Sequence, residues 1–120
     1  MKVFNFFLFW VFGFFVLLAF DLFIEAFLTL TSNTSGRMTV ALFKDTDTDA
    51  IASTFAWYGS ANEPLSIPLR YKMSAGTTSA ITFKIRAGMT SSSTFINGSN
   101  TSQIHNGVAT SSLSITEIKT

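Results

Sequence analysis

The stretch Ala80-Ile81-Thr82-Phe83-Lys84-Ile85-Arg86-Ala87-Gly88 shows the pattern that decides the fold of most of this chain. Every second side chain from Ile81 to Ile85 is apolar, and the alternate side chains Thr82, Lys84 and Arg86 are polar or charged. Successive side chains of a β-strand point to opposite faces of its sheet. The alternation therefore predicts a strand with one buried face and one solvated face, and the solvated face carries Lys84 and Arg86.

The composition limits the classes of function. The chain has 120 residues, enough for one domain with a modest core, and its net charge of +1 comes from 8 basic and 7 acidic residues scattered along it. Because no basic patch or stripe stands out, nucleic acid is not expected as a partner. Cysteine is absent and there is 1 histidine, so a zinc site lacks its usual ligands. No cofactor-binding motif is present, and no cofactor is expected.

Two parts of the chain differ in composition. Residues 1–30 contain 10 of the 14 phenylalanines, and residues 31–120 contain 30 serines and threonines among 90 residues. A serine- and threonine-rich sequence that is still regularly apolar is typical of an all-β domain, whereas a helical domain shows apolar residues at helical spacing. We therefore expect a hydrophobic segment over residues 1–20 and a β-sandwich domain over residues 21–120.

The hydrophobic segment is apolar from Val3 to Phe20 except for Asn5 and Gly13. As a helix, which we predict, it spans about 27 Å, close to the hydrocarbon thickness of a bilayer. Three interpretations remain open. The segment is a signal peptide or signal anchor, with Lys2 favouring a cytoplasmic N-terminus and a β-domain outside the cytoplasm. Alternatively it belongs to the domain core, or it is not native sequence and arises from a misplaced start or a shifted reading frame. A membrane partner is expected only if residues 3–20 are a genuine anchor.

Strand-like alternation bounded by turn residues recurs along the rest of the chain, over residues 22–30, 37–43, 51–58, 65–73, 80–87, 94–97 and 112–118. About seven or eight short strands at such intervals indicate an antiparallel two-sheet sandwich. The turn residues between the first two segments predict that they form a hairpin. Pro68 cannot donate a ladder hydrogen bond, so its strand is expected at a sheet edge or interrupted there.

The same alternation predicts which side chains form the core. In the segment over residues 37–43 the inward side chains are Met38, Val40 and Leu42. In the segment over residues 65–73 every second side chain from Leu65 to Met73 is expected to point inward.

Several pieces of the chain occur in an ordered series: Leu69–Gly76 (LRYKMSAG), Thr82–Gly88 (TFKIRAG), Ile96-Asn97-Gly98 and Ser111–Ile118 (SSLSITEI). Together they resemble the C-terminal β-sandwich domains of tail-fibre and other virion structural proteins of tailed phages. Such domains are similar to the jelly-roll heads of the C1q and tumour-necrosis-factor type, which assemble as trimers. In that group polar sequence precedes the first strand, whereas here the phenylalanine-rich run stands in its place.

The resemblance implies a jelly-roll-like sandwich with a non-enzymatic, structural role in a virion. It implies a tail-fibre or spike tip that forms a homotrimer and binds a host-cell glycan or protein. The alternative is a membrane-anchored or secreted C1q-like binding module with residues 3–20 as its anchor. No catalytic motif supports an enzyme, and we expect none.

An acidic turn is the one candidate for a metal site. Asp45, Asp47 and Asp49 have the first spacings of a calcium loop, but Ala50 and Ala56 stand where the loop needs its glycine and its bidentate glutamate. We therefore predict a solvated turn, with a weak calcium site as the alternative.

Two adjacent aromatic residues, Trp57 and Tyr58, are the candidates for a binding site or subunit contact. Neighbours on a strand face opposite ways, so one ring is expected in the core and the other in solvent. An outward aromatic residue can anchor a subunit contact or a glycan. Two glutamates, Glu25 and Glu117, lie within predicted strands and not in turns. Nothing in the sequence places them together for acid–base chemistry.

Overall fold

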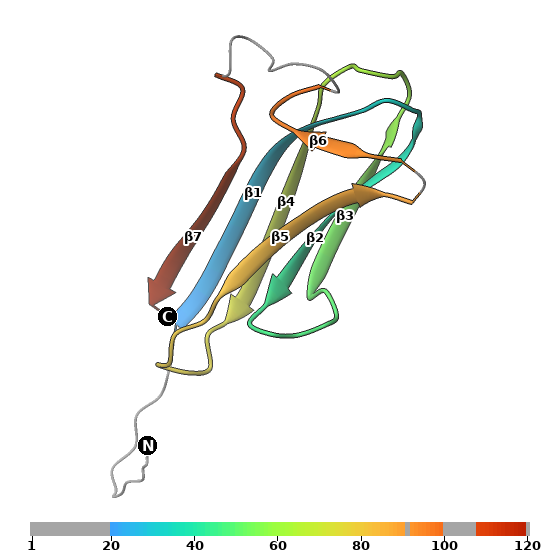
Figure 1. Ribbon diagram of the computed structural model, residues 1–120. Helices are drawn as coiled ribbons and strands as arrows, with labels where there is room; N and C mark the ends of the chain where they lie inside the picture. Colours follow the sequence, from blue (N-terminus) through green and yellow to red (C-terminus); the bar gives the residue numbers. More distant parts are fainter. Residues whose placement is uncertain (1–19, 91, 100–107, 120) are drawn as a thin grey trace, which may run out of the picture.

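The computed structural model describes residues 20–90, 92–99 and 108–119, and these form seven strands joined by turns and loops, without a helix (Figure 1). The strands are β1 (Phe20–Ser32), β2 (Gly36–Lys44), β3 (Ala52–Tyr58), β4 (Leu65–Ser74), β5 (Phe83–Met89), β6 (Thr94–Ile96) and β7 (Ser112–Lys119). Of the hydrophobic segment predicted over residues 1–20, with its helix and anchor, residues 1–19 lie outside the described residues, and Phe20 is the first residue of β1 instead of the end of a helix. Within the described part, no helix is long and apolar enough to cross a membrane.

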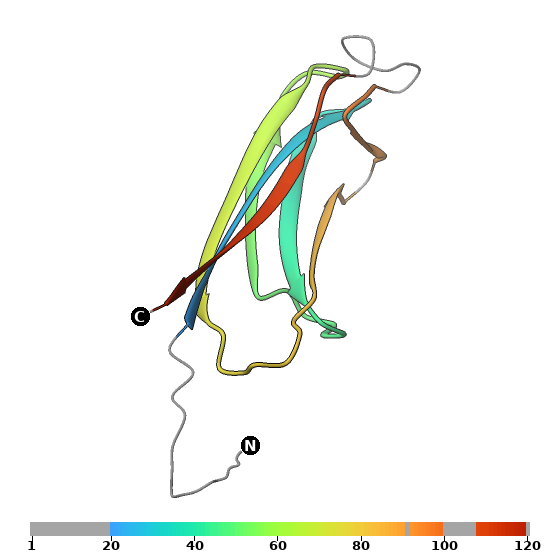
Figure 2. The ribbon, with the colours of Figure 1, turned by 90° about the vertical axis from the view of Figure 1, so that its left-hand side faces the viewer.

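The strands form two antiparallel sheets that face each other, which confirms the predicted sandwich (Figures 1 and 2). In the four-stranded sheet, β1 pairs with β4 along one edge and with β6 and β7 along the other. In the three-stranded sheet, β2 lies between β3 and β5. Strand β4 is an edge strand in the described structure, as Pro68 predicted.

The predicted hairpin between the first two strands is wrong. Strand β1 belongs to the four-stranded sheet and β2 to the three-stranded sheet, so the turn after Ser32 carries the chain from one sheet to the other. The inward side chains of the two strands consequently face each other across the core. Ile24 and Leu30 of β1 and Val40 and Leu42 of β2 are fully buried. Burial of the two apolar rows against one another stabilises the crossover, because each fully buried aliphatic side chain contributes roughly 1.5–3 kcal/mol.

The core confirms the predicted inward side chains. Met38, Val40 and Leu42 have no exposed surface, and Ile67 and Leu69 of β4 are buried opposite them. The remaining inward residues of β4 and the apolar residues of β5 pack against this cluster while partly exposed. Alternation therefore predicts the buried faces of β1, β2 and β4 correctly, although it does not predict which strand is the neighbour of each.

Strand β5 begins at Phe83, three residues later than the sequence pattern predicts. The reason lies at Thr82, whose backbone is bound to Asp45 at the end of β2. The Asp45 backbone N–H donates to the Thr82 carbonyl at 2.7 Å, and the Thr82 N–H donates to Asp45 Oδ1 at 2.9 Å. Ile81 still packs against the core, although it precedes the strand.

The two sides of the sandwich differ. Strands β3 and β4 lie against each other and close one side (Figure 1). On the other side, among the described residues, β5 pairs only with β2 and β7 pairs only with β1 (Figure 2). All residues of β7 are exposed, including Leu113 and Ile115, which point toward the space between the sheets. The sandwich is thus open along β5 and β7.

Candidate binding face on the three-stranded sheet

The outer face of the three-stranded sheet gathers aromatic and basic side chains. In an antiparallel pair, residues directly opposite each other lie on the same face. Arg37 of β2 is opposite Trp57 of β3, and Thr39 is opposite Phe55. The other outward residues of β2 are Ala41 and Phe43, opposite Arg86 and Lys84 of β5. We call this surface, made by Arg37, Thr39, Ala41, Phe43, Phe55, Trp57, Lys84, Arg86 and Gly88, the aromatic–basic face.

Trp57 and Tyr58 lie on opposite sides of the sheet. Trp57 is 71% exposed on the aromatic–basic face, whereas Tyr58 is 2% exposed in the core. The Tyr58 hydroxyl donates a hydrogen bond to the Ser32 carbonyl at 3.2 Å, across to the end of β1. Tyr58 therefore has a structural role that ties the two sheets together, and Trp57 remains the candidate for binding.

Two arginines of the aromatic–basic face lie over aromatic rings. The Arg37 guanidinium carbon is 5.7 Å from the centre of the Phe55 ring, and that of Arg86 is 4.4 Å from the centre of the Phe43 ring. At these distances a cation is attracted to the negative face of the ring. Phe43 is nearly buried although it points outward, because Arg86 covers it, whereas Phe55 is 66% exposed. Among the described residues, neither these two arginines nor Lys84 forms an ion pair.

A shallow hollow of about 290 Å³ lies on this face beside β5. The small residues Thr39, Ala41 and Gly88 line it, together with Phe43 and Arg86. No outward residue of β2, β3 or β5 carries a carboxylate. The face is therefore positively charged, with exposed rings on β3 and cations on β2 and β5.

The three aspartates predicted as weak calcium ligands lie in the turn after β2. The Asp45 carboxylate accepts hydrogen bonds from the Thr82 backbone and from Lys44 Nζ, the latter at 3.2 Å. These contacts, the Thr82 bond above all, hold the pKa of Asp45 below its usual value. Asp47 and Asp49 line a hollow in the same turn. In the described ranges, no group of three acidic or histidine side chains is placed to hold a metal ion.

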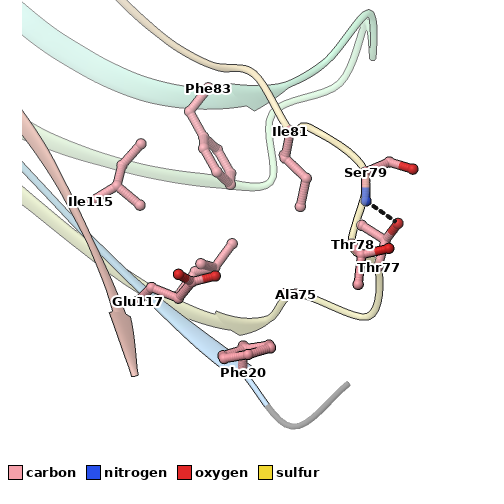
Figure 3. Close-up of a pocket in the computed structure, with 10 residues that line it drawn as sticks. Phe20, Ala75, Thr77, Thr78, Ser79, Ile81, Phe83, Ile115 and Glu117 are labelled. Carbon is pink, nitrogen blue, oxygen red and sulfur yellow. Dashed lines mark hydrogen bonds between the residues drawn. The ribbon is translucent and has the colours of Figure 1, made fainter. Parts of the chain in front are cut away.

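A second hollow, of about 310 Å³, opens between the sheets near the start of β1 (Figure 3). Phe83 of β5 and Ile81, which precedes that strand, line it on one side, and Phe20, Ile115 and Glu117 of the four-stranded sheet line it on the other (Figure 3). Glu25 does not reach it, because Glu117 is opposite the inward Leu22 and Glu25 points to the outer face. The two glutamates are therefore not a catalytic pair, and the hollow is the mouth of the open side.

The outer face of the four-stranded sheet is charge-balanced. Asp21 pairs with Lys72 and Glu25 with Arg70, in each case with 3.4 Å between nitrogen and oxygen. Phe23 lies between these pairs and Phe27 beyond them, whereas most of the outward residues of β7 beside them, Ser112, Ser114 and Thr116, are polar. Phe27 of β1 is 52% exposed, and Ile118 of β7 lies opposite the outward Asp21 and is also exposed. We call this surface the neutral face.

The strands, the two outer faces and the hollows define an all-β sandwich domain. Residues 19–120 match the family model described as the Pgp3 C-terminal domain. The chain belongs to this family, whose name refers to a virulence plasmid protein of Chlamydia. No curated protein matches the chain. The C1q-type jelly roll is compatible with the observed sandwich, and the match says nothing about phage tail fibres.

The sequence pattern predicts Trp57 as a candidate but not the other members of the aromatic–basic face. Phe55 has the same strand phase as Trp57, and Arg37 has the same phase as Phe43, so each strand alone carries part of the signal. These residues form one surface only because β3 and β5 both pair with β2 in this register. That register depends on pairings between distant segments.

Proposed function

We propose that this chain is a non-enzymatic structural domain that assembles as a homotrimer through the neutral face and β7, and displays the aromatic–basic face to a host-cell surface molecule. The structural role agrees with the family match. The hollow between the sheets supports a non-enzymatic role, because Glu117 is the only carboxylate among its lining residues. General acid–base catalysis usually needs a second positioned group.

The observation that carries the self-association is the exposure of β7. Leu113, Ile115 and Ile118 are each more than 40% exposed, on both faces of one strand. Phe27, on the adjoining strand, adds an aromatic ring to the same region. Exposed apolar patches of this kind mark interaction surfaces, and an exposed edge strand invites pairing. Contact with further copies of the chain removes this apolar surface from water.

The charge distribution favours the neutral face over the aromatic–basic face as the contact between copies. Asp21 and Glu25 neutralise Lys72 and Arg70 on the neutral face, so two such faces do not repel each other. Two aromatic–basic faces would bring Arg37, Lys84 and Arg86 against their own copies, and juxtaposed like charges are unfavourable. The choice of three copies follows the resemblance to C1q- and tumour-necrosis-factor-type heads.

A virion is the proposed setting, with the domain as a tail-fibre or spike tip. The alternative setting is a membrane-anchored or secreted C1q-like module, for which the support is the apolar run over residues 3–20. Carbonate extraction of membranes from cells that produce the full chain separates the two. Retention in the membrane pellet supports the anchor, and recovery in the supernatant removes it.

Sedimentation equilibrium of the full chain tests the self-association. Because residues 3–20 are apolar, the measurement uses a density-matched detergent, which makes no contribution to the buoyant mass. We expect a species of about three times the chain mass that persists on dilution to micromolar concentration. A monomer over the whole concentration range contradicts the proposal.

A further inference from the structure

We propose that the aromatic–basic face binds a linear sulfated polysaccharide, with Phe55 and Trp57 as stacking surfaces and Arg37, Lys84 and Arg86 as ligands for sulfate groups. This proposal specifies the class of the host-cell molecule to which the domain displays this face. It rests on the proposed function, in which the aromatic–basic face is turned toward solvent. The face on which it stands is made by three paired strands, so its side chains are held on a rigid support.

The cations lie in a row rather than in a point cluster. Arg37 and Phe43 are six residues apart on β2, about 20 Å at a rise of roughly 3.3 Å per residue. Arg86 is opposite Ala41 and Lys84 is opposite Phe43, so the two β5 cations lie near the far end of that span. A polymer that carries a negative group on each repeat can reach all three, whereas a single acidic sugar contacts one of them. Guanidinium groups suit this ligand because their planar N–H donors match tetrahedral oxyanions.

The aromatic residues offer a second kind of contact, beside charge, because a sugar ring can stack on them. Phe55 and Trp57 are 66% and 71% exposed on one strand, and both lie on the same face. The C–H face of a pyranose ring packs against an aromatic ring much as another apolar surface does. Arg37 lies over Phe55 and opposite Trp57, so a cation adjoins both rings. An oxyanion bound by Arg37 therefore belongs to a sugar within reach of the stacking surface.

Nucleic acid is the other linear polyanion, and the charges of the chain argue against it. The net charge is +1, and Asp45, Asp47 and Asp49 follow directly after the β2 end of the row. Asp45 is bonded to the Thr82 backbone, two residues before Lys84, so a carboxylate lies at the start of β5. Nucleic-acid binding needs an extended basic surface because each bound phosphate requires a cation. The row of three cations spans about 20 Å beside an acidic turn, which is too small for such a surface but sufficient for sulfate groups on a few sugars of one chain.

The test is a calorimetric titration of the full chain with a heparin hexasaccharide, which is too short to bridge subunits, so subunit number does not change the affinity per site. We expect binding that weakens on the order of tenfold between 50 and 200 mM salt, because bound cations release counterions. The same hexasaccharide after chemical desulfation should not bind. Equal binding of the two sugars overturns the proposal, as does tighter binding of single-stranded DNA of equal charge.

Two matched variants locate the site. The double variant Phe55→Ser, Trp57→Ala should lose at least tenfold in affinity, because it removes exposed rings from one face only. Phe27→Ser removes an exposed ring from the neutral face and should leave the affinity per chain unchanged. Loss of affinity in Phe27→Ser alone overturns the assignment. A trimer that does not bind the hexasaccharide overturns this inference but not the self-association. A monomer that binds the hexasaccharide overturns the self-association but supports this inference.

Discussion

The two outer faces of the sandwich share exposed aromatic residues and differ in charge. The neutral face carries two acidic and two basic side chains in pairs, and the aromatic–basic face carries three cations without a carboxylate on its strands. An apolar ring surrounded by balanced charge can meet its own copy, whereas a ring beside unbalanced cations repels its copy and attracts a polyanion. The difference teaches that the charge around an exposed phenylalanine decides which partner it can meet.

The largest expected effect comes from Trp57 and Tyr58, which separate an exposed ring from a buried one. Tyr58→Ala removes a core side chain and its hydrogen bond to Ser32, and should lower the free energy of unfolding by about 3–5 kcal/mol. Trp57→Ala, at a surface position, should change it by less than about 1 kcal/mol. Urea unfolding followed by circular dichroism measures both. Equal losses in the two variants would mean that Trp57 is not a free surface residue.

The next prediction tests the charge difference between the faces. Arg37→Gln with Arg86→Gln removes two cations from the aromatic–basic face and should weaken hexasaccharide binding on the order of tenfold and flatten its salt dependence. Arg70→Gln with Lys72→Gln removes two cations from the neutral face and is the matched control. It should leave the affinity within about twofold and lower stability by at most about 1–2 kcal/mol, since exposed ion pairs contribute little. Titration and urea unfolding check both outcomes. Similar losses of affinity in the two variants would remove the distinction between the faces.

The sequence predicts which side chains of a strand point inward, but it does not predict which strands pair with each other. Alternation places Met38 inside and Arg37 outside because the apolar phase of that strand is unambiguous. In β3 both phases contain aromatic residues, Phe55 and Trp57 in one and Tyr58 in the other. The pairing of Met38 with Ala56 decides the phase, because a core residue of β2 fixes the inward face of its partner. Such pairings join segments far apart in the chain, so a single strand does not reveal them.

The wrong hairpin has the same cause. Turn residues between two apolar strands are compatible with a tight hairpin and with a crossover between sheets. The crossover is the observed arrangement because both β1 and β2 bury a complete apolar row, and facing rows bury both sets of side chains at once. The late start of β5 depends on the bonds from Asp45 to Thr82, which local alternation does not encode.

A smaller effect concerns Asp45, the carboxylate beside the aromatic–basic face. Its pKa is lowered in the folded chain, chiefly by the Thr82 hydrogen bond and then by Lys44. A lowered folded pKa means stability that is present above the unfolded value of 3.8 and is lost as the pH falls through the folded pKa. The Asp45→Asn variant should therefore have a lower free energy of unfolding than the native chain at pH 7, and the two values should converge in acid. Urea midpoints from pH 7 to pH 2 check this, and a gap that stays constant contradicts it.

The most direct test compares one phenylalanine from each face. Sedimentation equilibrium is measured for the full chain carrying Phe27→Ser and for the full chain carrying Phe55→Ser, in the same density-matched detergent. The two substitutions remove the same ring from exposed strand positions, so they should lower the free energy of unfolding by similar amounts. We predict that Phe27→Ser shifts the trimer toward monomer while Phe55→Ser keeps the trimer mass. A monomer in Phe55→Ser with an intact trimer in Phe27→Ser would contradict the separation of the two faces.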